Sequence, residues 1–346
     1  MASVEKIYRL ISSMKTGLVL LGLIGLMSAI GTGFRPNTFF QTSLFKLMLL
    51  LLFLNMGLCT LNQLIRCMKR SSKSWGKNRL RQAGLLLLHG GVVLILVGGT
   101  VNSYFGHSGE LRIVEGNKVD VARVIPTEKP VLLRLDAFKI EFNADGSPSQ
   151  YYSHVSILEG NKAKGNYRIS VNHPLNYGGI KAYQQSFGYL VKVRGESATG
   201  EKVEKSLHEG EFLEIPGTER TVKVYKYIPN FAPNYGMDSK TLRPDNPRIV
   251  FSVYENGKLL GVGAAPWGKR IKIDNRIYVT FKGVQPFTVL KVKSDPGLPL
   301  AAAGGVMLVT GVCLAQCLAP VGKRGKQSAS SERKLEPVGG IMDGLQ

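Results

Sequence analysis

Four long apolar runs constrain the fold of this chain more than any other feature of its sequence. The runs are Gly17–Gly33, Phe45–Ile65, Gly84–Val101 and Leu298–Ala319. Each approaches or reaches the roughly 20 residues that a helix needs to cross a hydrocarbon core of about 30 Å. We therefore predict an integral membrane protein with four transmembrane α-helices, at about 17–33, 45–65, 84–101 and 297–319.

The residues before the first run invite comparison with a secretory signal. Lys6, Arg9 and Lys15 precede this run, as basic residues precede the apolar part of a signal peptide. A cleavable signal, however, leads into a soluble chain, whereas here a second apolar run follows almost at once. We expect an uncleaved membrane anchor.

The distribution of lysine and arginine predicts the orientation of the helices. The loop between the second and third runs is strongly basic, whereas the loop between the first and second has Arg35 alone, with Lys46 just inside the second run. The basic residues are Arg66, Lys69, Arg70, Lys73, Lys77, Arg79 and Arg81. Cytoplasmic loops carry such an excess, so both termini are expected in the cytoplasm and residues 102–296 outside it. Lys323, Arg324 and Lys326, after the last run, agree with this orientation.

These features predict a multi-pass protein of a bacterial-type inner (cytoplasmic) membrane with a large periplasmic domain. Residues 1–101 would form the N-terminal membrane domain, 102–296 the extracytoplasmic domain, 297–319 the last helix and 320–346 a disordered cytoplasmic tail. Much of the net charge of +21 lies beside the membrane ends. We therefore expect contact with anionic membrane lipids, and no nucleic-acid binding.

The cysteines are confined to the membrane part of the chain. Cys59, Cys67, Cys313 and Cys317 all lie in the apolar runs or at their cytoplasmic ends. The extracytoplasmic segment contains none, so disulfides do not hold it together. Cys313 and Cys317 are spaced for one helical face and could form a thiol pair, although packing between helices is the commoner explanation.

Residues 109–292 have the pattern of an antiparallel β-rich domain. Glu110–Val114 and Lys118–Val121 flank one turn, and Ile249–Tyr254 and Lys258–Val262 flank another, so both pairs predict hairpins. Further strands are expected at Val131–Phe142, Ser153–Leu158, Tyr167–Val171, Ile180–Ser186, Tyr189–Arg194, Arg220–Tyr227, Arg270–Ile273 and Tyr278–Lys282. We expect a sandwich or irregular barrel around one core, with a long loop at Pro229–Pro247.

His89 is the most informative single residue. It stands alone among apolar residues in the third run, roughly 8–12 Å in from the basic loop at about 1.5 Å of rise per residue. A lone imidazole at such a depth could relay protons, form a hydrogen bond to a neighbouring helix, or ligate a metal or haem iron. Gly90 and Gly91 beside it leave a flat surface that either a helix or a porphyrin could approach.

The other histidines form no pattern typical of a metal site. His107, His154, His173 and His208 all lie in the extracytoplasmic segment without metal-ligand spacing. His107 lies close to the outer end of the third run and could contact haem from outside, or it could be an ordinary loop residue. No nucleophile elbow, phosphate loop or paired carboxylates occur, so we expect no catalytic residue in this chain.

Four segments in order along nearly the whole chain resemble one known family. They are Leu88–Gly98, which carries His89, then Phe105–Gly116, Val171–Ser186 and Lys291–Gly297. In sequence and in their place in the predicted topology, these segments resemble the ResB (also called CcsB) family of cytochrome c biogenesis proteins. That family has three N-terminal membrane helices, a large extracytoplasmic domain and a closing helix.

The resemblance implies a subunit of the System II cytochrome c synthetase, which is a haem lyase. Such a subunit works with a CcsA (ResC) type membrane partner, an apocytochrome c and a thiol-reducing partner of thioredoxin type. It implies that His89 is an axial ligand to haem in transit, and that this chain is at most a co-catalytic subunit. This sequence has no histidine after His208, so the second axial ligand is expected from the partner.

Two alternatives to haem handling remain open. The chain could be a scaffold that binds no haem, stabilises the partner subunit and docks apocytochrome, with His89 hydrogen-bonded to a neighbouring helix. It could also be a proton-linked transporter with His89 as the relay, although the four runs offer no second ionisable residue at depth.

Overall fold

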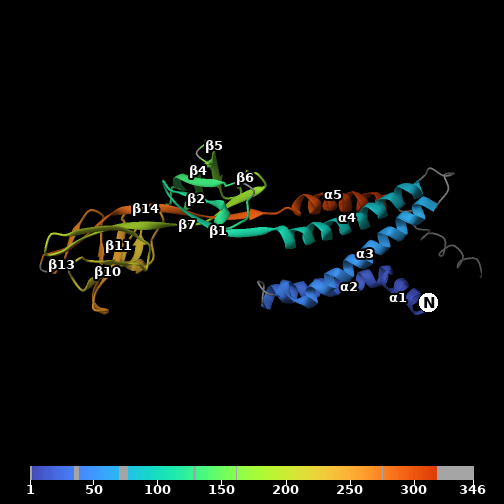
Figure 1. Ribbon diagram of the computed structural model, residues 1–346, viewed down its shortest axis with the longest axis horizontal. Coiled ribbons are helices and arrows are strands. Elements are labelled where there is room, and N and C mark those ends of the chain that lie inside the picture. The colour runs from blue at the N-terminus through green and yellow to red at the C-terminus, as the bar shows by residue number, and fades with distance from the viewer. Residues whose placement is uncertain are drawn as a thin grey trace, which may run out of the picture. The chain divides into compact units, whose positions relative to one another are not determined.

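The computed structural model describes residues 2–34, 39–69, 77–127, 130–160, 162–274 and 276–317. These residues form two compact units (Figure 1). One consists of helices, and the other, Asn102–Pro296, begins in the last turn of a helix and contains the strands. Arg35, much of the predicted basic loop and the predicted C-terminal tail lie outside the described residues.

Four of the five helices have the length and composition expected of membrane spans. The helices are α1 (Ala2–Ile11), α2 (Met14–Phe34), α3 (Ser43–Lys69), α4 (Lys77–Phe105) and α5 (Leu298–Cys317), with a short 3₁₀ helix η1 (Phe39–Gln41) before α3. By length and hydropathy, α2, α3, α4 and α5 could each cross a membrane. The four predicted apolar helices are therefore confirmed. The helix α1 was not predicted from the sequence; it is a short amphipathic helix in which Arg9 pairs with Glu5 at 2.7 Å.

Polar side chains of α3 stabilise the break between α1 and α2. The break leaves the carbonyl groups of Ile11, Ser12 and Ser13 near the middle of α3. The amide of Asn55, which is 1% exposed, donates to the carbonyl oxygens of Ile11 and Ser13, the latter at 3.0 Å. The thiol of Cys59 donates to the carbonyl oxygen of Ser12 at 3.2 Å. These bonds satisfy carbonyls that a helix end otherwise leaves unpaired.

Replacing Asn55 with leucine is expected to lower the free energy of unfolding by about 1–3 kcal/mol, because buried carbonyl groups lose their donors. Denaturant unfolding of the purified protein would measure this change. Thr60→Val is the matched control, because the Thr60 hydroxyl donates only within its own helix, to Met56 O at 2.7 Å. Equal losses for the two variants would contradict the proposed role of Asn55.

The strands of the second unit form three antiparallel sheets. The largest has the order β1-β14-β7-β6, with β13 on β14 and β8 on β7. The other two have the orders β2-β3-β4-β5 and β12-β11-β10-β9. The strands are β1 (His107–Val114), β2 (Lys118–Asp120), β3 (Leu132–Phe142), β4 (Pro148–Glu159), β5 (Lys162–Ser170), β6 (Leu175–Tyr177), β7 (Ile180–Glu196), β8 (Lys202–Leu207), β9 (Phe212–Glu214), β10 (Arg220–Ile228), β11 (Arg248–Glu255), β12 (Lys258–Ala265), β13 (Arg270–Asp274) and β14 (Ile277–Ser294).

One of the two predicted hairpins is confirmed and the other is wrong. β11 and β12 pair across the turn at Asn256, as predicted. β1 and β2 do not pair, because β1 pairs with β14 and β2 with β3. The turn between them instead joins two sheets, since Gly116 N donates to Leu135 O at 2.8 Å and Leu135 N donates to Asn117 O at 3.1 Å.

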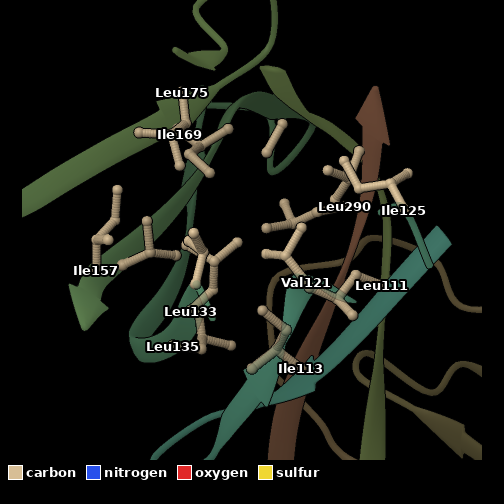
Figure 2. Close-up of a cluster of buried hydrophobic side chains, with 14 of the residues drawn as sticks. Leu111, Ile113, Val121, Ile125, Leu133, Leu135, Ile157, Ile169, Leu175 and Leu290 are labelled. Carbon is tan, nitrogen blue, oxygen red and sulfur yellow. The ribbon is translucent and has the colours of Figure 1, made fainter. Parts of the chain in front are cut away.

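The prediction of a single core is also wrong, because the described strands surround two large cores, beside a small third cluster of Leu190, Phe287 and Val289. The first core lies between β1, β14, β7 and the β2-β3-β4-β5 sheet, and Figure 2 shows its leucine and isoleucine side chains pointing toward one another. The second lies between β7, β14, β8 and the β12-β11-β10-β9 sheet. Two long strands join the cores, and Figure 1 shows β7 and β14 running through both groups of strands. From the sequence, β7 was predicted as two strands and β14 was predicted to end at Lys282, while β6, β8 and β9 were not predicted.

Two β-bulges let the β7–β14 ladder present one face to both cores. The register shifts at Gln185 in β7 and at Lys282 in β14. Each bulge inserts one residue, so the side chains that point inward change from even to odd positions or the reverse. In β7, Ala182 lies in the first core before the bulge and Val191 in the second core after it. A regular strand would have turned one of these two residues to the opposite face of the sheet.

Candidate functional site

His89 lies in the middle of α4 with its ring held by its own helix. The Nδ1 atom lies 2.8 Å from the carbonyl oxygen of Leu85, one turn earlier. A carbonyl oxygen can only accept, so Nδ1 carries a hydrogen, and in the neutral form of the ring the lone pair is on Nε2. Nε2 has no hydrogen-bond partner among the described residues. This arrangement suits a metal ligand, because ligating histidines usually donate their other ring N–H to a carbonyl or carboxylate.

A row of glycines on another face of α4 packs against α5. Gly84, Gly91 and Gly98 are spaced seven residues apart, and each lies against the backbone of α5 or the residue before it. A Cβ atom added at Gly91 would lie 2.6 Å from both Gly304 O and Leu308 N. Such glycines let two membrane helices approach closely, and a seven-residue period keeps the same face in contact. We call Gly84, Gly91 and Gly98 the glycine seam.

His89 points away from the glycine seam. Its position is two residues from Gly91, so the two lie about 160° apart around the helix at about 100° per residue. Gln82, seven residues before His89 and on the same face, contacts the Cys67 thiol of α3 at 4.0 Å. His89 therefore does not form a hydrogen bond between α4 and α5.

The two glycines beside His89 have different surroundings. Gly91 packs against α5. From the sequence, either a helix or a porphyrin could have approached this position. A Cβ atom at Gly90 would meet the Met307 Cε atom at 3.5 Å, an ordinary contact, so this position is less crowded. The involvement of Gly90 and Gly91 in cofactor binding stays a prediction.

His107 belongs to the β-rich unit, where it is the exposed first residue of β1. It lines a polar cavity of about 210 Å³ together with Asn102, Gly106, Ser108, Lys293 and Asp295. The Oδ1 atom of Asn102 is buried there without a hydrogen-bond partner. The structure therefore gives His107 a polar setting at the junction of α4 and β1, and its contact with haem stays a prediction.

The remaining histidines are dispersed over the β-rich unit. His154 lies on β4 near Tyr152, and His173 lies in the turn before β6. His208 follows β8, and its ring lies edge-on to that of Phe287, with 5.3 Å between the ring centroids. No three His, Cys, Asp or Glu residues gather into a metal-binding group in the part of the chain that the structure describes.

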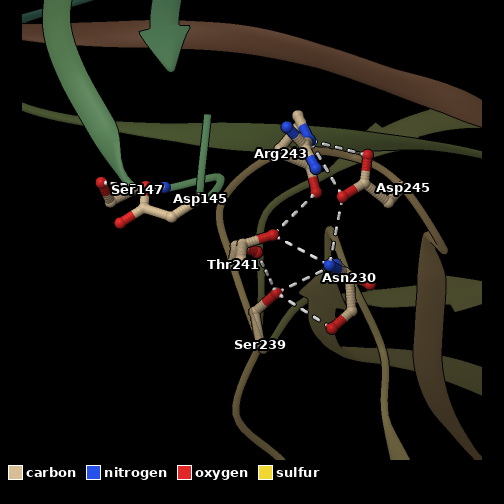
Figure 3. Close-up of polar contacts among 7 residues, drawn as sticks. All are labelled: Asp145, Ser147, Asn230, Ser239, Thr241, Arg243 and Asp245. Carbon is tan, nitrogen blue, oxygen red and sulfur yellow. Dashed lines mark hydrogen bonds and ion pairs between the residues drawn. The ribbon is translucent and has the colours of Figure 1, made fainter. Parts of the chain in front are cut away.

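The predicted long loop contains a hydrogen-bonded network centred on Asn230 (Figure 3). Asn230 binds the hydroxyl groups of Ser239 and Thr241, each at 2.9 Å, and Arg243 pairs with Asp245 at 2.9 Å. Part of this loop, residues 239–242, and the turn between β3 and β4 together line a cavity of about 370 Å³. In that turn, hydrogen bonds from Ser147 hold the pKa of the Asp145 carboxyl below its usual range.

The second core carries an aromatic group that the sequence analysis did not identify. The ring of Tyr227 lies edge-on to that of Tyr189, with 4.9 Å between the ring centroids. It also stacks on the ring of Trp267, with 6.0 Å between the centroids. Burial raises the pKa of Tyr189 to about 12 and raises the pKa of Tyr227 as well. Both phenols therefore stay neutral at physiological pH and act as packing groups rather than as acids.

A comparison with known protein families decides the family of this chain. A model described as the ResB-like family matches residues 74–266, which is more than half of the 346 residues. The chain belongs to the ResB-like family.

Curated relatives of this ResB-like chain share one kind of name. The "Cytochrome c biogenesis protein CcsB" of Synechococcus sp. (strain JA-3-3Ab) is 26% identical over 255 residues, covering 69% of this chain and 51% of the relative. The "Cytochrome c biogenesis protein Ccs1" of Porphyra purpurea is 25% identical over 246 residues, covering 68% and 53%. The chain thus spans about half the length of the curated relatives it matches.

A solved structure with some similarity is "Cytochrome c Heme Lyase CcmF". It is 10% identical, with a TM-score of 0.31, and the match covers 87% of the ResB-like chain and 34% of the other. This TM-score is too low to indicate a shared fold.

The sequence of the ResB-like chain contained signals for the residues that the analysis missed. The glycine seam is visible as three glycines at seven-residue intervals, and Asn55 is a polar residue within an apolar run. Neither signal identifies the partner that the residue contacts, which is why their roles appeared only in the structure.

Proposed function

We propose that this chain is the ResB-type subunit of a System II cytochrome c assembly machinery. In this proposal α2, α3, α4 and α5 cross the inner membrane with both termini in the cytoplasm, and the β-rich unit lies in the periplasm. The chain handles haem within the membrane together with a CcsA (ResC) type partner. The haem is then attached by thioether bonds to an exported apocytochrome c. Family membership and the names of the relatives support this role.

The observation that carries the proposal is the state of the His89 ring. Its Nδ1–H group is held by Leu85 O, and its Nε2 lone pair has no partner among the described residues. An ionisable side chain in an apolar helix costs free energy, so His89, with one ring nitrogen left without a partner in the described part of the chain, is a functional candidate. Because His89 points away from α5, its Nε2 atom is available to haem iron, with the second axial ligand supplied by the partner subunit.

The β-rich unit is proposed to dock the apocytochrome and the outer loops of the partner. Thioether formation uses the cysteine thiols of the apocytochrome, which a thioredoxin-type partner keeps reduced. The absence of cysteine from residues 102–296 suits this role, because a thiol there could exchange into mixed disulfides with the substrate. The contribution proposed for this chain is binding and positioning, in a subunit that is at most co-catalytic.

His89→Gly is expected to lower the Soret absorbance of the complex purified with its partner at least about tenfold, because an axial ligand is lost. Added imidazole should restore the absorbance, since a free imidazole fits the space that the side chain leaves. The measurement is the Soret spectrum of wild type and variant, with and without imidazole, beside the yield of mature cytochrome c.

Leu96→Gly is the matched control, because Leu96 lies seven residues after His89 on the same face of α4. It should keep its Soret absorbance and show no response to imidazole. An unchanged spectrum and unchanged maturation in His89→Gly would favour the scaffold that binds no haem. If His89 is instead a proton relay, His89→Gly should lose activity while the complex keeps its haem absorbance.

A further inference from the structure

The strand β12 forms one edge of the β12-β11-β10-β9 sheet, and its outer side is open. It pairs with β11, and no other strand in the described part of the chain pairs with it. Lys258 and an irregularity in the pairing at Leu260 protect the start of β12, whereas from Gly261 to Ala265 the pairing with β11 is regular and the stretch has no charged residue, proline or bulge. An edge without these features invites pairing with another chain, so Gly261–Ala265 is the open part of this edge.

The side chains along this edge are apolar and exposed. Leu259, Leu260 and Val262 are 50%, 48% and 66% exposed, and Trp267, just beyond the strand, is 40% exposed. The core side of β12 carries only Gly261, Gly263 and Ala265, opposite Val253, Phe251 and Ile249. The apolar side chains of β12 therefore contribute little to the second core and form an open apolar edge.

We propose that β12 binds an extended segment of the substrate polypeptide by strand addition. The unpaired backbone groups of this edge can pair with a partner that offers N–H and C=O groups in extended form, as an added β-strand does. Alternate side chains of the added strand would contact Val262 and Leu259. Lys258, the exposed first residue of β12, favours a segment with an acidic residue at the end that lies beside it.

The inference rests on the proposed function, in which the substrate is an apocytochrome. A polypeptide that has not yet received its haem lacks the group around which its core forms, so it can offer extended segments. Binding through backbone groups depends little on sequence, which suits a site that holds a chain before it folds.

Val262→Lys tests the inference in the full-length protein in detergent. The probe is an unfolded, haem-free cytochrome c polypeptide with alkylated cysteines. Hydrogen exchange of residues 258–265 should slow when the wild-type protein binds the probe, because strand addition pairs the outer amides of β12. Val262→Lys should weaken probe binding at least about tenfold, since an edge lysine opposes strand pairing.

Met237→Lys is the matched control, because Met237 is an exposed apolar residue of the long loop, 42% exposed. It should bind the probe as the wild type does. Since Val262 is largely exposed, exchange in β10 and β11 should stay unchanged in the unbound variant, which would show that the sheet remains folded.

Each other outcome overturns the inference. Normal binding without slower exchange in β12 would place the substrate elsewhere and leave the proposed function intact. No binding by the wild type would count against substrate docking itself. Slow exchange in β12 before the probe is added, together with the mass of two chains, would mean that a second copy covers the edge.

Discussion

Gly91→Leu is expected to separate α4 from α5 and to lower the free energy of unfolding by about 3 kcal/mol, at the upper end of the usual cost of overpacking. Even a Cβ atom at this position would lie 2.6 Å from backbone atoms of Gly304 and Leu308. Backbone cannot rotate away as a side chain can, so the two helices must move apart along the glycine seam. Denaturant unfolding of the purified protein and its accumulation in membranes would both measure the loss.

The same helix offers a matched control for this change. A Cβ atom at Gly99 would have no atom within 4 Å, so Gly99→Leu adds the same side chain to α4 where there is space. We expect Gly99→Leu to unfold as the wild type does. Equal destabilisation by the two variants would mean that helix propensity or lipid contact, rather than packing against α5, explains the effect.

Phe281→Ala is expected to lower the free energy of unfolding by about 3–5 kcal/mol, because it leaves a large cavity in the second core. Phe281 is fully buried on β14, and its ring lies 5.1 Å from that of Phe251. β14 also contributes Leu290 to the first core. We therefore expect faster hydrogen exchange in both cores, since the β7–β14 ladder belongs to each.

Tyr225→Ala is the control for Phe281→Ala, because Tyr225 is an aromatic residue that is 56% exposed in the same group of strands. It should change the free energy of unfolding by less than about 0.5 kcal/mol. If exchange in Phe281→Ala becomes faster around the second core but not in β3, β4 and β5, the two cores unfold independently. That result would contradict the coupling that we infer from the shared ladder.

Hydrophobic pattern alone was sufficient to predict the four long apolar helices and most of the strands. It also singled out His89 as a functional candidate, whereas its role as a haem ligand was implied by the family resemblance and stays a prediction. A run of about 20 apolar residues predicts a helix in an apolar environment, and alternation of apolar and polar residues predicts a strand with one buried face. The β11–β12 hairpin was predictable because its turn and both strands are adjacent in the chain. The same holds for His89, whose isolation among apolar residues is a local property.

The pairing of distant segments was decided by the tertiary structure. The turn after β1 resembles that of a hairpin, yet β1 pairs with β14 because Leu111 and Ile113 are buried beside Leu290. The bulge at Gln185 reverses the alternation within β7, so a period-two pattern divides one strand into two. Likewise, three glycines on α4 indicate close packing, but only the structure identifies α5 as the helix they contact. Local periodicity shows which face of an element is buried, whereas its partner depends on contacts between residues far apart in the chain.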